Sequence, residues 1–391
     1  MVILINLCII VSNTHENKAL NLSVGGVANQ ILQLLPSYEK IDNLNIFLVT
    51  KYSEYIPQTN KVKKVSIQKF KERKLDEVYF FLKSIFKVVH LHKINHIHAI
   101  NIHSYYYNMI SPLIVRLIFK IPLFIKAPSD FNTHQREEFV FSSQSIFVKL
   151  FYYGWMKFFK KIIIRMKDVY IQAINDKIYD DFIKSGISKA NIIKLPNGIE
   201  SKRFLKIEKN IEEQTNFGYI GRLLETKNLR FLLRSFKNYL NYYPNDKLYF
   251  FGEGPEKKFI KNFIREHKLT NSIIALGFEK DKSHIYSRIN VLIHPTFGEG
   301  VPNIILESIL TNTFVIASNV SGIKDIIDHK KTGLLFNPFR EDDLLKQLLF
   351  FKKNSESIEL MKNTAKKRIL EKYDVDIVTK ALYKFLLMRI T

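Results

Sequence analysis

Short apolar runs alternate with helical patterns along this chain, and this alternation constrains its fold more than any other feature. A continuous apolar run of four to ten residues is typical of a strand that is buried on both faces, as in parallel sheets covered by helices. The pattern therefore predicts an α/β fold with doubly wound parallel sheets. In the first half the runs are Val2–Val11, Leu44–Val49, Ile94–Ile100, Ile121–Ile125, Val169–Ala173 and Ile192–Leu195.

The chain has a predicted domain junction near its middle. The turn-forming sequence Pro196-Asn-Gly198 is followed by a charged segment, poor in strand patterns, that runs to about Gln214. Apolar runs then start again at Asn216. Because 391 residues are enough for two domains of ordinary size, we expect one domain over residues 1–195 and a second over residues 196–374, joined by a hinge.

Charge and cysteine content limit the classes of partner. The formal net charge of +23 favours anionic partners, namely nucleic acid, an anionic membrane surface or phosphorylated substrates. The single cysteine, Cys8, excludes an internal disulfide framework and a cysteine-based metal site, so a reducing, cytoplasmic setting is expected. The first apolar run is soon interrupted by Asn13 and Glu16, which favours a buried strand, and any membrane contact should be peripheral.

Two segments are strongly basic. Residues Lys61–Lys74 contain seven basic side chains and one acid, Glu72, and are either a solvated face or a surface for lipid phosphates. Residues Lys149–Lys167 contain no acid and have a helical pattern with an aromatic side and a basic side. Such a helix can pack on its own sheet or lie in a membrane interface.

The most informative local pattern is Pro295–Glu307. It follows a strand-length apolar run, Asn290–His294, and places Glu299 between two glycines. Pro302 suits the first turn of a helix, whose N-terminus at a sheet edge offers backbone N–H groups to phosphate or sugar hydroxyls. Glu307 would lie about a turn and a half into that helix. The alternative is that Glu299 only complements the helix dipole and that Glu307 is an ordinary solvated residue.

The spacing of these two acids resembles the Glu-x7-Glu signature of the family-4 retaining glycosyltransferases, within the group 1 glycosyl transferases. Arg222, at the end of a predicted strand, and Lys227 are similar to the family's Gly-Arg-Leu and Lys-Gly positions, although either could be plain surface charge. The resemblance implies the GT-B fold, with two Rossmann-like domains facing across a cleft and a final helix, residues 375–391, crossing back to the first domain. Shorter matches are Pro196-Asn-Gly198, Gly252-Glu-Gly254-Pro255 and Gly333-Leu-Leu335.

The resemblance also implies roles for residues. Glu299 would orient the donor sugar and Glu307 would hold the nucleotide ribose, while Arg222 and Lys227 would stabilise the leaving diphosphate. Backbone groups at the start of the helix, around Gly300 and Val301, would assist them. Further donor contacts are expected from Gly25, Gly26, Gly221, Gly252, Gly254 and Phe278.

The acceptor side is less defined by the sequence. His103 and Asp130 both follow predicted strands, and ligands bind at the carboxyl ends of strands in open α/β sheets. Family members often carry a histidine where this chain has Ser129 or Asp130, so the polar group that faces the acceptor stays open. His103 could equally be a structural histidine, and His134 could take the family's position.

The expected activity is transfer of a hexosyl or N-acetylhexosaminyl group, with retention, from a nucleotide-sugar donor to a lipid-linked or glycan acceptor. Such a reaction would serve cell-surface polysaccharide or glycolipid assembly, need no metal or other cofactor, and take place in the cytoplasm, peripherally on the inner face of the cell membrane. Two alternatives stay open. One is a GT-B nucleotide-sugar epimerase, and the other is a basic nucleic-acid-binding protein, although no nucleic-acid module is present and no nucleic-acid partner is expected.

Overall fold

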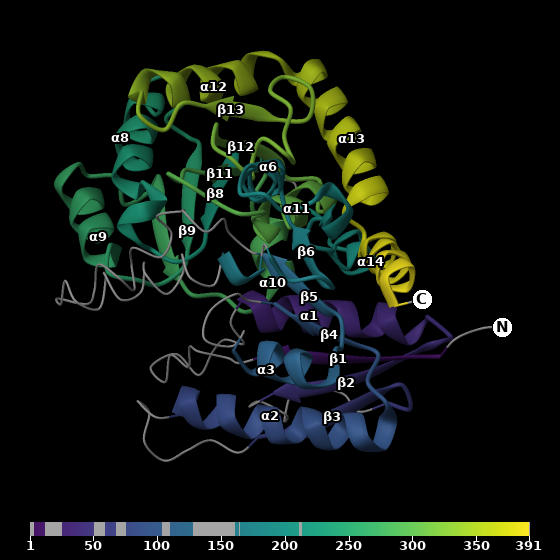
Figure 1. The fold of residues 1–391 in the computed structure, drawn as a ribbon. Helices are drawn as coiled ribbons and strands as arrows, with labels where there is room; N and C mark the ends of the chain where they lie inside the picture. The colour runs from purple at the N-terminus through teal and green to yellow at the C-terminus, as the bar shows by residue number, and fades with distance from the viewer. Residues whose placement is uncertain are drawn as a thin grey trace. The chain divides into compact units, whose positions relative to one another are not determined.

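The structure is a computed structural model with two units, each built on one parallel sheet (Figure 1). One unit comprises Met1–Gly198 together with Val375–Thr391, and the other comprises Ile199–Asp374. The chain thus leaves the first unit after Gly198, whereas the sequence indicates a boundary after residue 195. The described residues are 4–11, 26–50, 59–67, 76–103, 110–127, 161–163, 165–210 and 213–390.

The first unit has a seven-stranded sheet in the order β3-β2-β1-β4-β5-β6-β7, and its paired strands are parallel. The strand order reverses at β1, between β2 and β4, which is where open α/β sheets bind ligands at the carboxyl ends of their strands. The strands are β1 Ile5–Val11, β2 Leu44–Thr50, β3 Val62–Ser66, β4 Ala99–Ile102, β5 Leu123–Ala127, β6 Val169–Ala173 and β7 Ile192–Lys194.

The last helix of the chain belongs to this first unit. The Phe385 ring packs edge-on against Tyr170 and Phe124, with ring centroids 5.9 and 6.0 Å apart. The Asp376 carboxylate accepts hydrogen bonds from Ser37 Oγ at 2.6 Å and Lys40 Nζ at 2.7 Å. The helix therefore covers apolar sheet surface that the first 198 residues leave uncovered. The helices of this unit are α1 Gly26–Glu39, α2 Asp76–Asn95, α3 Ile110–Phe119, α6 Asp176–Lys184, the 3-10 turn η4 Lys189–Asn191 and α14 Val375–Ile390.

The expected strand at Ile94–Ile100 is wrong in its first half. Helix α2 continues to Asn95, His96 takes a left-handed conformation with φ 48°, and β4 begins only at Ala99. The buried residues Phe80, Ser84 and Val88 follow a helical period and continue the helix into the apolar window. A short apolar run by itself does not distinguish a strand from the end of a helix.

Part of the basic segment Lys61–Lys74 forms a strand that the sequence does not predict. Residues Val62–Ser66 form β3, which pairs with β2 on one side only. Val62 is buried while Lys63 is exposed, and an edge strand tolerates such charges because they discourage pairing with another chain. Residues 68–75, and residues 149–160 and 164 of the second basic segment, lie outside the described residues.

The second unit has a six-stranded parallel sheet in the order β10-β9-β8-β11-β12-β13. Its core is rich in aromatic rings, among them Phe217, Phe236 and Tyr239, which contact one another. The strands are β8 Asn216–Ile220, β9 Lys247–Phe251, β10 Ile273–Gly277, β11 Val291–His294, β12 Phe314–Ser318 and β13 Leu334–Phe336. The helices are α7 Ser201–Phe204, η5 Glu225–Lys227, α8 Leu229–Tyr239, α9 Lys257–Glu266, α10 Lys282–Arg288, α11 Asn303–Leu310, α12 Glu341–Lys353 and α13 Ser355–Lys372.

This topology brings the predicted donor residues to one edge of the second sheet. The strand order reverses between β8 and β11, and the loops after β8, β9 and β11 leave from the same, carboxyl, edge. These loops carry Arg222, Gly252 and Glu299. Segments far apart in the sequence therefore meet at the topological switch point, which is the expected ligand position in such a sheet.

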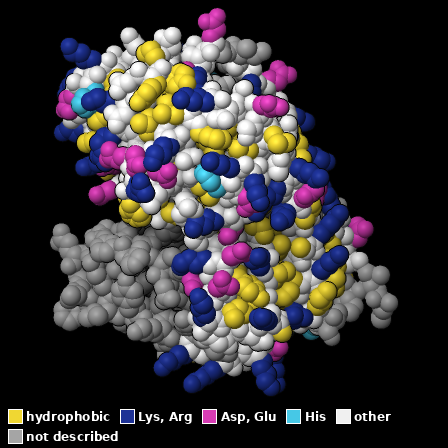
Figure 2. All heavy atoms as spheres, turned by 90° about the horizontal axis from the view of Figure 1, so that it is seen from above, with side chains coloured by type: hydrophobic (Ala, Val, Ile, Leu, Met, Phe, Trp, Pro, Cys, Tyr) yellow, Lys and Arg dark blue, Asp and Glu magenta, His cyan; other side chains and the backbone are white. Residues whose placement is uncertain are grey.

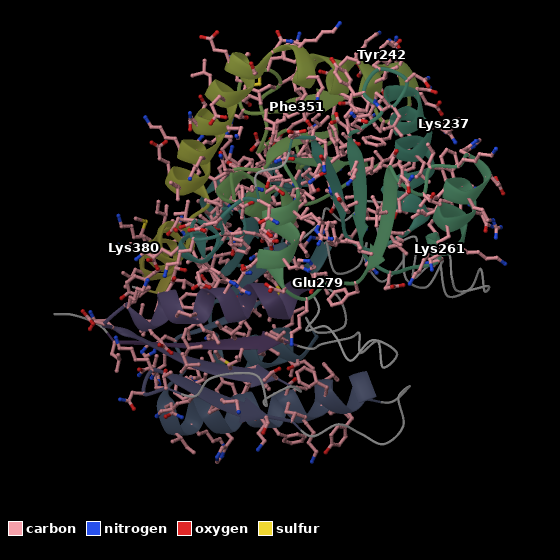
Figure 3. All side chains as sticks on the ribbon, turned by 180° about the vertical axis from the view of Figure 1, so that it is seen from behind. Lys237, Tyr242, Lys261, Glu279, Phe351 and Lys380 are labelled. Atoms are coloured by element: carbon pink, nitrogen blue, oxygen red, sulfur yellow. The ribbon has the colours of Figure 1, made fainter. Side chains whose placement is uncertain are left out.

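The surface of the molecule is rich in cations. Lys and Arg side chains are scattered over the described part of the face shown in Figure 2, with apolar patches between them. On the second unit, Lys237 of α8 and Lys261 of α9 point outward from their helices (Figure 3). Among the helices of the described residues, none is both long enough and apolar enough to cross a membrane.

Candidate functional site

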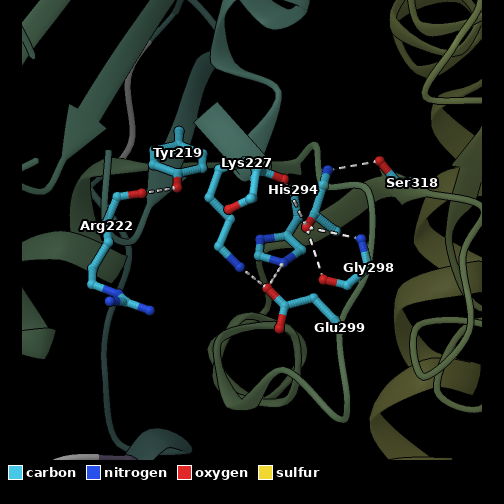
Figure 4. Close-up of polar contacts among 9 residues, drawn as sticks. Tyr219, Arg222, Lys227, His294, Gly298, Glu299 and Ser318 are labelled. Carbon is cyan, nitrogen blue, oxygen red and sulfur yellow. Dashed lines mark hydrogen bonds and ion pairs between the residues drawn. The ribbon is translucent and has the colours of Figure 1, made fainter. Parts of the chain in front are cut away.

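Glu299 lies in the loop after β11 and is held by two basic side chains (Figure 4). Its Oε1 forms an ion pair with Lys227 Nζ and lies 3.4 Å from His294 Nε2. The side chains of Glu299 and Lys227 are each only 18% exposed. Burial alone would raise the pKa of Glu299, but the contacts with His294 and Lys227 outweigh it and lower that pKa to about 2. Glu299 is therefore ionised at neutral pH and pairs with a cation.

A short network of backbone contacts holds this pair in place. Phe297 N donates to Thr226 O at 3.2 Å, which ties the Glu299 loop to the turn that carries Lys227. Thr296 N donates to Ser318 Oγ at 2.9 Å, and Thr296 Oγ1 donates to Gly298 O at 3.1 Å. The ends of β11 and β12 thereby fix the loop from both sides, so the carboxylate is positioned before any ligand arrives.

Arg222 follows β8 at the same edge of the sheet. The buried Tyr219 side chain donates its hydroxyl proton to Arg222 O at 2.7 Å and so fixes the backbone at this turn. In Figure 4 the side chains of Arg222 and Lys227 point to the same side of the loops as the Glu299 carboxylate. Two cations and one carboxylate are thus gathered where β8 and β11 end.

Glu307 lies on α11 and is buried, with 6% of the residue exposed. Its Oε2 accepts a hydrogen bond from the Tyr286 hydroxyl at 2.7 Å and another from Lys282 Nζ at 2.9 Å. The alternative that Glu307 is a solvated helix residue is therefore wrong. Sequence reasoning missed both donors, although Lys282 and Tyr286 are four residues apart on α10 and thus share one face of that helix.

Glycines bring the backbones of these loops into direct contact. A Cβ atom on Gly252 would lie 1.8 Å from Gly221 O, and one on Gly322 would lie 1.7 Å from Gly300 O. Gly322 also has φ +81°, in the left-handed region that favours glycine. Gly254 is similarly close to the backbone of Leu223. The turns after β8, β9, β11 and β12 therefore pack backbone to backbone, and a side chain at Gly252 or Gly322 would force them apart.

The other predicted donor residues occupy more varied places. Gly300 and Val301 precede α11, which begins at Asn303 with Pro302 as its N-cap, so the helix starts one residue later than expected. Phe278 directly follows β10 and is 47% exposed. In the first unit, Gly26 is the first residue of α1. Gly25 and Asp130 lie outside the described residues.

In the first unit, two basic side chains share the carboxyl edge of the sheet. The strand register pairs Ile102 with Ile125, so His103 and Lys126 are next to each other where β4 and β5 end. His103 is 3% exposed, and its ring nitrogens have no hydrogen-bond partner among the described residues. Burial lowers the pKa of Lys126 to about 7, and burial and then Lys126 lower that of His103 well below its usual range. The sequence singles out His103 but places Lys126 after the strand.

The described residues contain no group of three or more His, Cys, Asp or Glu side chains placed to hold a metal ion. Cys8 is buried in β1 and is a free thiol.

The chain is similar to proteins of known class. Residues 201–368 match the family model described as "Glycosyl transferases group 1". The chain is 29% identical over 197 residues to an uncharacterized glycosyltransferase of Methanocaldococcus jannaschii, covering 44% of this chain and 48% of that one. It is 26% identical over 235 residues to the capsular polysaccharide biosynthesis glycosyltransferase CapM of Staphylococcus aureus, covering 54% and 60%. The chain thus spans about half the length of these curated relatives.

Solved structures show the fold over the whole chain. The structure of HepE from Anabaena in complex with UDP superposes with a TM-score of 0.72 at 14% identity, and covers 98% of this chain and 100% of that one. A glycosyltransferase from Rickettsia africae gives a TM-score of 0.74 at 12% identity, with 99% of each chain covered. The predicted fold class is confirmed. The chain therefore has the GT-B fold, and residues 201–368 match the group 1 glycosyl transferases.

Proposed function

We propose that this protein is a retaining glycosyltransferase that moves a hexosyl or N-acetylhexosaminyl group from a nucleotide-sugar donor to an acceptor hydroxyl, in polysaccharide or glycolipid assembly. One observation carries the proposal. The Lys227–Glu299 ion pair and the buried Glu307 both lie in the segment that matches the group 1 glycosyl transferases. A pair of carboxylates with separate basic partners suits a ligand that has two hydroxyl-bearing sugar rings and a diphosphate between them.

The leaving diphosphate is assigned to Arg222 and Lys227. Cleavage of the bond between sugar and diphosphate develops negative charge on the phosphate oxygens, and preorganised cations stabilise that charge. Arg222 offers planar, bidentate contacts, whereas Lys227 acts as a compact point charge. These side chains supply the positive charge in our proposal, so it includes no metal and no other cofactor. The leaving phosphate takes the proton from the acceptor hydroxyl, and no protein side chain acts as the base.

The ion pair between Lys227 and Glu299 suggests how donor binding changes the site. In the structure the charges of Lys227 and Glu299 pair with each other. A diphosphate provides a new anionic partner for Lys227, and Glu299 is then able to accept hydrogen bonds from hydroxyls of the donor sugar. Donor binding thus exchanges one ion pair for two sets of ligand contacts. These contacts offset the free-energy cost of separating Lys227 from Glu299.

Glu307 is assigned to the nucleotide ribose. Tyr286 and Lys282 hold its Oε2 from one side, so the carboxylate has a fixed orientation when it accepts hydrogen bonds from the two ribose hydroxyls. A rigid, prepositioned acceptor loses little conformational entropy on binding. Glu307 therefore contributes to donor affinity, whereas Lys227 and Arg222 act on the reacting bond.

On the acceptor side, we assign His103 to the site in the first unit, with Lys126 as its neighbour. Asp130, the other candidate from the sequence, lies outside the described residues. The buried His103 ring suits a polar ligand, because a ring nitrogen without a hydrogen-bond partner among the described residues is costly to bury. A hydroxyl of the acceptor would satisfy such a nitrogen.

A thermal-shift panel tests the donor assignment. The full chain is heated with UDP, GDP, ADP or CMP, and then with the corresponding sugars; UDP comes first because HepE has been solved with it. We expect one nucleotide to raise the melting temperature, and Glu307→Ala and Lys227→Ala to remove most of that increase. Lys261→Ala, a change at an exposed residue of α9, is the control and should keep it. Equal protection in all four proteins contradicts the assignment. Turnover of the donor without any acceptor would instead indicate an epimerase.

A further inference from the structure

Helices α2 and α3 of the first unit lie side by side and parallel (Figure 1). Ser84 Oγ and Ser111 Oγ are 2.6 Å apart near the start of the contact, and the rings of His92 and Phe119 are 4.8 Å apart near its end. The inner side of α2 is the buried stripe Phe80, Ser84 and Val88 described above. The exposed residues of α2 lie away from this stripe, and Leu117, Ile118 and Lys120 are exposed at the end of α3.

The exposed sides of the two helices, which together we call the α2–α3 face, carry both apolar and basic side chains. Its most exposed apolar residue is Phe86, at 72% exposure. On α2 the exposed positions recur at helical spacing, so they form one stripe rather than scattered points. The exposed apolar residues of the face are Leu82, Phe86, Ile94, Leu117 and Ile118. Its exposed basic residues are Lys83, Lys87, His90, Lys93 and Lys120.

The two stretches that carry the exposed residues of this face, Tyr79–Asn95 and Ser111–Lys120, include no Asp or Glu. The acids of α2, Asp76 and Glu77, are confined to its first turn. Core packing does not explain the apolar members, because these side chains point away from the core that Phe80 and Val88 enter. A second copy of this chain is a poor occupant, since two faces of like charge on chains of net charge +23 repel each other. An occupant of this face must offer both apolar contact and negative charge.

We propose that the α2–α3 face docks on a lipid bilayer with anionic headgroups. Phe86 and Ile94 enter the boundary between headgroups and acyl chains, as apolar side chains of amphipathic surface helices do. Lys83 and Lys87 lay their aliphatic stems along this apolar surface and place their ammonium groups at the headgroup phosphates. The proposal is independent of the donor site, and it places the first unit, to which we assign the acceptor, beside lipid.

Co-sedimentation with vesicles tests the proposal on the full chain. One set of vesicles contains equal parts of phosphatidylglycerol and phosphatidylcholine, and the other contains phosphatidylcholine alone. We expect binding to the first set and little to the second. We also expect roughly tenfold or greater weakening for each of two variants, Phe86→Ser with Ile94→Ser, and Lys83→Glu with Lys87→Glu. All four changed residues are exposed, and unchanged melting temperatures will show that the variants fold.

Two matched variants on the second unit test whether vesicle binding depends on the α2–α3 face or only on the net positive charge of the chain. Leu360→Ser changes an apolar residue that is 70% exposed on α13, and Lys258→Glu with Lys261→Glu reverses two exposed lysines on α9. Both should bind vesicles like the unchanged chain. Equal weakening in these controls, or equal binding to both kinds of vesicle, overturns the proposal. A lower molecular mass in solution for Phe86→Ser with Ile94→Ser, with vesicle binding unchanged, would show a contact between copies and overturn it too.

Discussion

Glu299 shows how single contacts set the state of this site. A carboxylate with this little exposure would favour its neutral form, yet His294 and Lys227 keep it charged. Its partners are His294 at the end of β11 and Lys227 in η5. Lys227 is 72 residues away from Glu299 in the chain. The charge of Glu299 in the segment Pro295–Glu307 is therefore balanced by Lys227, a residue outside that segment, and the charge of Lys227 is balanced by Glu299.

The pKa of Glu299 predicts how the stability of the folded chain depends on pH. Its folded-state pKa is about 2 and its ordinary value is 4.5, so the pairing stabilises fully above about pH 4.5 and is lost as the pH falls towards 2. Glu299→Gln leaves Lys227 without its partner and should lower the free energy of unfolding by about 3 kcal/mol at pH 7. The gap between the two proteins should narrow steadily below pH 4.5.

Urea unfolding of both proteins at pH 7, 5, 4 and 3 measures that gap. Glu359→Gln serves as the control, because Glu359 is exposed and makes only a surface ion pair with Lys362. A gap that stays constant from pH 7 to pH 3 would mean that Glu299 is not held ionised by Lys227.

At the scale of elements, the proposed donor site is a set of turns packed on one another at the carboxyl edge of the second sheet. The sequence predicts most of these turns, because a strand that ends in glycine is a strong local signal for a turn. It predicts neither the contact between the turns after β11 and β12 nor the role of α10 in holding Glu307, because both depend on how separate strands are ordered in the sheet. Likewise, the sequence predicts a strand at the end of α2, because a short apolar run does not distinguish a strand from the end of a helix.

Gly322→Ala tests the packing of these turns. The new Cβ would lie 1.7 Å from Gly300 O at a φ of +81°, so the backbone around Gly300 must move. We expect a loss of at least about 2 kcal/mol in the free energy of unfolding, from strain and lost packing, together with weaker nucleotide protection. Ser321→Ala at the neighbouring position should change neither quantity by much. A Gly322→Ala protein with full stability and full protection would show that the turns are not rigidly packed.

At the scale of the whole molecule, the sequence predicts the fold class well and the function in part. Alternating apolar runs are a property of many residues at once, so a boundary placed a few residues away, at residue 195 or at Gly198, leaves the two-sheet organisation unchanged. The final helix is different: the expectation that it returns to the first unit comes from the family resemblance, because contacts such as Phe385 with Tyr170 are not contained in any local pattern. The surroundings of His103 are the least predictable from the sequence, because one histidine has no distinctive spacing and the strand expected at Ile121–Ile125 stops short of Lys126, which lies within β5.

The donor assignment is tested most directly by the dissociation constant of the nucleotide that the thermal-shift panel selects. Calorimetric titration would compare the unchanged chain with Glu307→Ala, Lys227→Ala and the exposed control Lys261→Ala. We expect weakening by about tenfold or more for the first two variants, since each loses charged hydrogen bonds of about 1.5–3 kcal/mol, and no change for the control. Equal dissociation constants in all four proteins would contradict a nucleotide-sugar site at Lys227 and Glu307.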